Sequence, residues 1–291
     1  MFRYLIVLLW PAVIAVLIGG AYLLTRRSSD GLSGDGLTPR DGRRRHGHRG
    51  AGISSLRDST TGAGQIILVA VVGGAVAVGV MSLLGLLVVH HGLTIDKPIF
   101  TWMQTHRVHV MKSLMERLTK IGDTWTTWGA AAAAAVCLAV TWREKRWVPP
   151  VALATLIVVD HFATLALRHE FERLGPPTSP LGTYPSGGCD RCIVFFGLIA
   201  YLLWREFSGR RATAIWAGAA VLALGFNEAY SRVYLSLHWF TDSLSGLLYG
   251  GLLLAGMIIA VQLVAGRPVQ PLTDRQAEGV PAGLAAEDPV A

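Results

Sequence analysis

The chain has 291 residues, of which 52% are hydrophobic and only 15% are charged. A soluble domain carries about 25% charged residues, so this composition argues against an ordinary soluble protein and against a disordered chain. The apolar residues also form long blocks, which indicates that lipid surrounds most of the chain. The net charge is +7, but the basic residues lie between the apolar blocks. That pattern reflects membrane topology, and no nucleic-acid partner is expected.

Seven segments are apolar enough, and nearly or fully long enough, to cross a bilayer, which takes about 20 helical residues. Lipid offers no partners for unpaired backbone groups, so we expect an all-α, polytopic membrane protein. The segments run approximately over residues 4–24, 65–89, 125–142, 148–167, 189–204, 212–226 and 243–265.

Composition divides the chain into four regions. Residues 1–24 are expected to form an N-terminal transmembrane anchor. A cleaved signal peptide is the alternative, but the apolar run is followed by arginines and not by a cleavage site. Residues 25–64 are rich in Gly, Ser and Arg and predict a flexible basic linker, either simply solvated or bound to anionic lipid headgroups. Residues 65–265 hold six spans, and residues 266–291 are expected to be disordered.

The basic residues predict the orientation. If the arginine-rich linker is cytoplasmic, alternation places the short basic loops at 143–146 and 205–211 inside, together with the C-terminus. The N-terminus and the loops at 168–190 and 227–242 then face outward from the plasma membrane. Residues 93–124 are also outside, and their apolar spacing predicts an amphipathic helix at the interface.

The loop at 227–242 carries the most informative polar residues. His238 and Asp242 are four residues apart near a helix start, which predicts that they share one face. A carboxylate there can accept the proton of one ring nitrogen and leave the other free to attack an electrophile. Arg232 lies six residues upstream, and its planar guanidinium suits a phosphate.

The loop at 168–190 offers a complementary anion site. Ser186, Gly187 and Gly188 stand just before a predicted helix, where free backbone N–H groups attract anions and glycines allow a close approach. The hydroxyl of Ser186 adds a hydrogen bond, and Arg168 supplies a second cation. With His238, this set suits phosphoryl transfer through a phosphohistidine, for which no metal or cofactor is expected.

At these residues the sequence resembles the PAP2 (type 2 phosphatidic acid phosphatase) superfamily, which also contains the vanadium haloperoxidases. The family motif S-R-x5-H-x3-D is complete as Ser231, Arg232, His238 and Asp242. The resemblance covers about residues 65–265 and implies a six-helix transmembrane core, to which the N-terminal anchor is an addition. It also implies that His238 is the nucleophile, Asp242 its partner and Arg232 a phosphate ligand.

The other two family motifs are degenerate. In K-x6-R-P the lysine is replaced by Arg168 and the arginine by Gly175, and in P-S-G-H the histidine is replaced by Gly188. In the family that histidine protonates the leaving group, and losing a general acid costs about 10²–10⁴-fold in rate. The nearby residues that could substitute are Arg173 and Arg191 for the cation and Asp190 and His169 for the acid.

Two further polar features have open roles. Glu228 stands four residues before Arg232 and is expected to orient it through a salt bridge. Asp160 and His161 lie inside a predicted span, where they either pair with other helices or line a polar cavity beneath Arg168.

Two hypotheses about function follow. The first is a membrane enzyme, a phosphoric monoester or diphosphate hydrolase, that acts on lipid phosphates or diphosphates through a phosphohistidine. The alternative is a catalytically impaired PAP2-like protein that binds or translocates lipid phosphates.

Overall fold

The computed structural model describes residues 50–142, 145–177, 179 and 183–266. This part of the chain contains α-helices and one short 3-10 helix, and no strand. The helices are α2 (Gly50–Thr105), α3 (His109–Leu118), η1 (Thr119–Gly122), α4 (Thr124–Thr141), α5 (Val148–Phe171), α6 (Gly187–Phe207), α7 (Arg211–Tyr234) and α8 (Phe240–Ala265).

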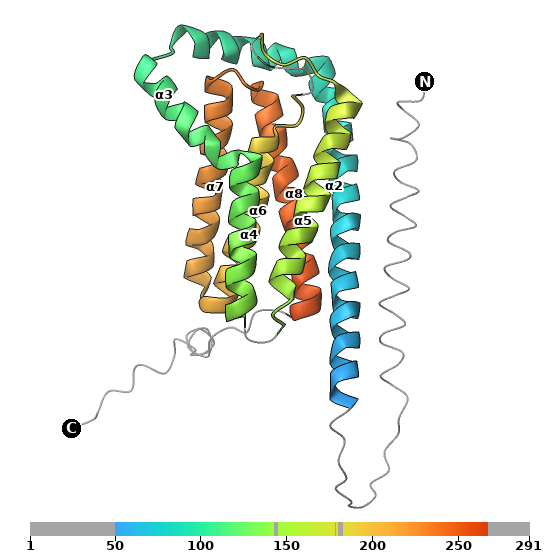
Figure 1. The fold of residues 1–291 in the computed structure, drawn as a ribbon. Helices are drawn as coiled ribbons and strands as arrows, with labels where there is room; N and C mark the ends of the chain where they lie inside the picture. Colours follow the sequence, from blue (N-terminus) through green and yellow to red (C-terminus); the bar gives the residue numbers. More distant parts are fainter. Residues whose placement is uncertain (1–49, 143–144, 178, 180–182, 267–291) are drawn as a thin grey trace, which may run out of the picture.

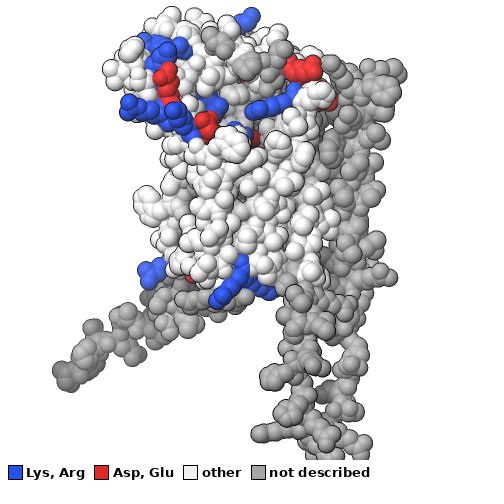
Figure 2. Space-filling view, in the orientation of Figure 1, with Lys and Arg blue, Asp and Glu red and all other residues white. Residues whose placement is uncertain are grey.

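Six of these helices are long and apolar enough to cross a membrane: α2, α4, α5, α6, α7 and α8. They stand side by side as a bundle, with α3 and the α5–α6 and α7–α8 connections at one end (Figure 1). Charged side chains gather at the two ends of the visible face and leave an uncharged belt between them (Figure 2). Large apolar side chains such as Trp216, 76% exposed, cover the belt. The expected all-α, multi-pass membrane fold is confirmed.

The helix boundaries differ from the expected ones mainly in α2. The anchor expected at residues 1–24 lies outside the described residues, as does the tail after Gly266. α2 begins at Gly50, inside the expected linker, and continues through Pro98 into the segment expected to lie at the interface. Charged residues end the apolar run but do not end a helix, because helical hydrogen bonds are satisfied within the backbone whether the side chains face lipid or water.

Close packing positions the start of α6 against α8. A Cβ on Gly246 would collide with the carbonyl oxygen of Ser186, and a Cβ on Gly250 would lie 2.6 Å from that of Asp190. Only glycine permits this approach of two backbones. The buried Tyr184 ties the preceding loop to α2, since its hydroxyl donates to the carbonyl oxygen of Met81 at 2.9 Å.

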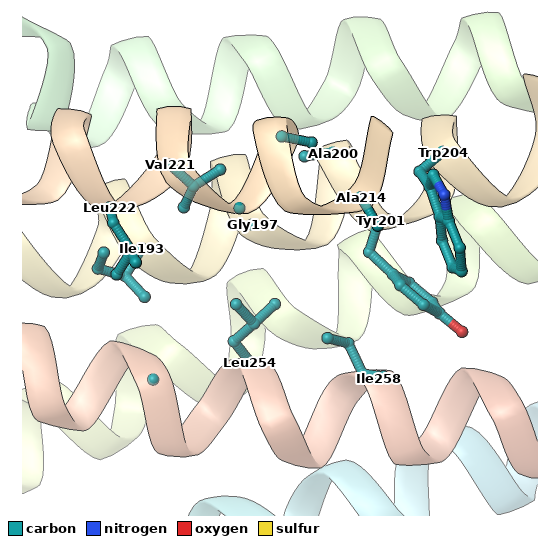
Figure 3. Close-up of a pocket in the computed structure, with 13 residues that line it drawn as sticks. Ile193, Gly197, Ala200, Tyr201, Trp204, Ala214, Val221, Leu222, Leu254 and Ile258 are labelled. Carbon is teal, nitrogen blue, oxygen red and sulfur yellow. The ribbon is translucent and has the colours of Figure 1, made fainter. Parts of the chain in front are cut away.

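An apolar groove lies within the belt, between α6, α7 and α8 (Figure 3). Its volume is about 370 Å³. Small residues such as Gly197 and Ala200 leave the space open, and the rings of Tyr201 and Trp204 lie at one end. The groove is separate from the polar site at the end of the bundle.

Candidate active site

Three guanidinium groups gather at the N-terminus of α6. Arg168 comes from the last turn of α5, Arg191 from α6 itself and Arg232 from the last turn of α7. A Cβ on Gly187 would lie 2.6 Å from Arg168 Nη2 and 2.9 Å from Arg191 Nη1. A Cβ on Gly188 would lie 2.5 Å from Arg232 Nε. We call these three arginines and two glycines the arginine cradle; it combines positive charge with a helix N-terminus and so suits a phosphate.

Acidic residues hold Arg232 in the cradle. Its Nε donates to Glu228 Oε1 at 2.6 Å, and its Nη2 donates to Asp123 Oδ1 at 3.1 Å. Glu228 also accepts a hydrogen bond from Thr119 at 3.1 Å, which fixes the carboxylate against η1. The predicted salt bridge between Glu228 and Arg232 is confirmed.

His238 borders the cradle. Its Nδ1 donates to the carbonyl oxygen of Thr183 at 2.9 Å, because a carbonyl can only accept. Nε2 therefore keeps a free lone pair. Burial, followed by the nearby charges of Arg232 and Arg168, lowers the pKa of His238 to about 3. The ring is neutral at physiological pH, as a nucleophile has to be.

The predicted contact between His238 and Asp242 is wrong. Asp242 forms an ion pair with Arg173 and accepts the backbone N–H of Trp239 at 3.3 Å. The physical reason is that α8 starts only at Phe240, so His238 precedes the helix and the four-residue spacing does not place the two side chains on one helical face. The carbonyl of Thr183 takes the place expected for the carboxylate.

Arg173 belongs to a buried network beside His238. Its guanidinium donates to Asp96 at 2.7 Å, to Thr241 at 2.9 Å and to Asp242. Asp96 also accepts the backbone N–H of Thr241 at 2.9 Å, so α2, the α5–α6 connection and α8 are joined here. The donors of Arg173 thus serve carboxylates, which argues against its expected role as a replacement phosphate ligand. Sequence reasoning missed Asp96, whose only signal was an acid at the end of an apolar block.

The remaining residues expected at the site lie in different surroundings. Arg191 lies in the cradle, as its expected role requires, whereas His169 is exposed on α5. Asp190 is fully buried one helical turn beyond Gly187, and its Oδ2 accepts a hydrogen bond from Thr164 at 3.3 Å. Ser186 is buried at the N-cap position of α6, where its side chain makes no capping hydrogen bond, and its backbone N–H donates to the carbonyl oxygen of Asp242 in the first turn of α8 at 3.0 Å.

Comparison with known proteins agrees with the geometry. The family model of the PAP2 superfamily matches residues 166–264. An Escherichia coli protein named "Putative undecaprenyl-diphosphatase YbjG" is 25% identical over 159 residues, which are 51% of this chain and 69% of that protein.

A solved structure is similar in fold. It is a transmembrane PAP2-type phosphatidylglycerolphosphate phosphatase from Bacillus subtilis, 18% identical, with a TM-score of 0.56 over 70% of this chain and 96% of that one. The region that the family model matches contains His238 and all five residues of the arginine cradle. Residues 166–264, which carry the candidate site, are thus similar to the PAP2 superfamily.

Proposed function

We propose that the protein is an integral-membrane phosphatase that removes phosphate from lipid phosphates or diphosphates, with His238 as the nucleophile. The observation that carries this proposal is a neutral imidazole with a free Nε2 beside three guanidinium groups at a helix N-terminus. The names of the two relatives support a phosphorylated lipid as the substrate class.

The first step forms a phosphohistidine. The arginine cradle binds the phosphate oxygens and spreads their charge over preorganised donors. Nε2 of His238 then attacks phosphorus, the bond from phosphorus to the leaving oxygen breaks, and that oxygen takes up a proton from a water molecule. The ring now carries a positive charge, which the hydrogen bond from Nδ1 to Thr183 stabilises.

The second step releases the product. A water molecule attacks the phosphorus of the phosphohistidine, gives up a proton and restores the neutral ring with inorganic phosphate. The network of Arg173, Asp96 and Asp242 is a positioning device in this scheme, because it fixes the start of α8 next to the loop that holds His238. No step requires a metal.

We propose that the cradle faces the outside of the cell and the C-terminus the cytoplasm. Arg205, Arg210 and Arg211 lie at the α6–α7 connection, at the opposite end of the bundle, which the positive-inside rule places in the cytoplasm. In intact cells, a membrane-impermeant thiol reagent should label His169→Cys and not Arg210→Cys, in a Cys137→Ser background. The reverse labelling would overturn the orientation.

The test of activity is phosphate release in detergent. Wild type should release phosphate from phosphatidate or a prenyl diphosphate in the presence of a chelator, and His238→Ala should lower the rate by at least about 10³-fold. His90→Ala is the matched control, because His90 is exposed and its Nδ1 bonds to the carbonyl oxygen of Leu86 in its own helix. An alkaline quench of wild type with labelled substrate should retain label on the protein, and His238→Ala should retain none.

One observation favours the second candidate, a protein that binds or translocates lipid phosphates. Gly188 presents no acid where the family motif has histidine. If wild type and His238→Ala show the same background release and both bind lipid phosphate, the enzyme proposal fails and this candidate replaces it.

A further inference from the structure

The chain between Arg232 and His238 leaves α7 through a tight turn. The backbone N–H of Ser236 donates to the carbonyl oxygen of Val233 at 3.0 Å, and that of Leu237 donates to the carbonyl oxygen of Arg232 at 2.9 Å. This pair of bonds defines a Schellman motif, which needs a left-handed backbone at the position of Ser236. Ser236 has a φ of 61°. The turn therefore sets the direction in which the chain runs from α7 to His238.

Serine is an unusual residue for the left-handed position of this turn. Glycine is the common one, because a Cβ is strained in that conformation. Such strain persists only where the surrounding structure holds the backbone in place, and it concentrates at functional sites. Ser236 is only 2% exposed, so its hydroxyl has to find its partners inside the protein.

Two side chains from the end of α2 hold the hydroxyl of Ser236. Arg107, which follows α2, donates from Nη2 to Ser236 Oγ at 2.8 Å and to the carbonyl oxygen of Tyr234 at 2.5 Å. Gln104, in the last turn of α2, donates from Nε2 to the same Oγ. The guanidinium of Arg107 also lies over the ring of Tyr234, 5.7 Å from its centroid. Arg107 thus fixes the end of α7 and the turn that follows it.

Further contacts make this connection rigid. The hydroxyl of Tyr234 accepts the backbone N–H of Val108 at 2.8 Å and donates to the carbonyl oxygen of Val108 at 3.1 Å. The α5–α6 connection adds a contact of its own, since Ser179 Oγ donates to the carbonyl oxygen of Leu237 at 2.6 Å. The loop that carries His238 is therefore tied to two separate parts of the chain.

We propose that Arg107 is a positioning residue for His238: by holding the left-handed turn at Ser236, it keeps Nε2 of the imidazole directed at the phosphate in the arginine cradle. Arg107 acts through the turn and not through contact with the substrate. This inference rests on the proposed function, since it assigns a residue that places the nucleophile of the same site.

The first test is steady-state phosphate release from phosphatidate in detergent. Arg107→Met removes the donor and should lower kcat by about 10–100-fold, because a displacement of about 1 Å in a reacting group costs up to about 10²-fold. KM should stay within about twofold of wild type, since the cradle that binds the phosphate is unchanged. Arg107→Lys keeps a donor and should recover part of the loss. Arg117→Met is the matched control, because Arg117 is exposed on α3, and it should keep the wild-type kcat.

A second substitution distinguishes positioning from a general loss of structure. Glycine adopts the left-handed conformation without strain, so Ser236→Gly added to Arg107→Met should raise kcat by about fivefold over Arg107→Met alone. Ser236→Ala in the same background keeps the strain and should give no recovery. A wild-type kcat in Arg107→Met, or the same kcat in the two double variants, overturns the inference.

The chemical reactivity of His238 gives a readout that needs no turnover. His238 is only 8% exposed, so diethyl pyrocarbonate, which modifies neutral imidazoles, should react with it slowly in wild type. In Arg107→Met the reaction, followed by mass spectrometry of the peptide, should be several-fold faster, with exposed His90 as the internal reference. Faster modification in Arg107→Met, with no phosphate release by wild type, overturns the phosphatase and leaves the positioning role standing. Phosphate release by wild type, with neither kcat nor the modification rate changed in Arg107→Met, overturns the positioning role alone.

Discussion

Gly188 is the position at which a single methyl group probes the arginine cradle. In Gly188→Ala the new Cβ would lie 2.5 Å from Cζ, Nε and Nη2 of Arg232. Ordinary van der Waals contact begins at 3.4 Å, so the guanidinium has to move by 3.4 − 2.5 = 0.9 Å. Its bonds to Glu228 at 2.6 Å and Asp123 at 3.1 Å resist that movement.

The expected result is a loss of activity without a loss of stability. Misplacing a catalytic contact by about 1 Å can cost about 10²-fold, so kcat/KM for phosphate release from a lipid phosphate should fall by about that factor, or about 2.7 kcal/mol. Alanine is a better helix former than glycine by about 0.5–1 kcal/mol, which offsets strain in the folded state. The assay is phosphate release in detergent, beside a thermal unfolding curve.

Gly218→Ala on α7 is the matched control, because a Cβ there meets nothing within 4 Å. Its activity should equal that of wild type. Gly188→His, which restores the family motif, should lose activity for the same reason as Gly188→Ala. If Gly188→Ala retains activity within about twofold of wild type, Arg232 does not bind the reacting phosphate and the cradle is misassigned.

Three further predictions concern the surroundings of the cradle. Because the pKa of His238 is about 3, against an ordinary 6.5, phosphate release should not fall with a midpoint near pH 6.5. The same shift means that the folded protein resists protonation of His238. The unfolding temperature should therefore drop more in wild type than in His238→Gln as pH falls from 6.5 towards 3. Arg173→Leu leaves the buried carboxylates of Asp96 and Asp242 without their cation and should cost about 3–5 kcal/mol of unfolding free energy. Lys112→Leu breaks an exposed ion pair and should cost less than about 1 kcal/mol. Equal losses in the two variants would contradict the buried network. Tyr184→Phe removes the bond to the carbonyl of Met81 and should cost about 1 kcal/mol in thermal unfolding, and no change would mean that the bond is absent in the membrane.

The sequence predicted the helical bundle well because lipid imposes a simple rule on the chain. Each apolar block of sufficient length has to be a helix, and the described spans follow those blocks. The rule does not locate helix ends, since backbone hydrogen bonding continues past the last apolar residue. α2 therefore reaches Thr105, although its apolar run ends near His90.

Within the site, residues in one motif were easier to predict than their partners. Arg232 and His238 were identified from their spacing, and the i, i+4 contact between Glu228 and Arg232 lies within one helix. Asp96 was missed because its partner Arg173 is 77 residues away. The acceptor for His238 is the main-chain carbonyl of Thr183. Every residue type has such a carbonyl, so the amino-acid sequence could not identify this acceptor.

The length of α2 has a consequence for what precedes it. A Cβ on Gly62 would lie 2.7 Å from Trp147, so α2 meets the non-cradle end of the bundle at about that residue. The twelve helical residues from Gly50 to residue 61 then project about 12 × 1.5 = 18 Å farther along the axis, as a rigid stalk. Surface potentials decay over about 8 Å at physiological ionic strength. The first residue of α2 thus lies some two screening lengths beyond that end of the bundle.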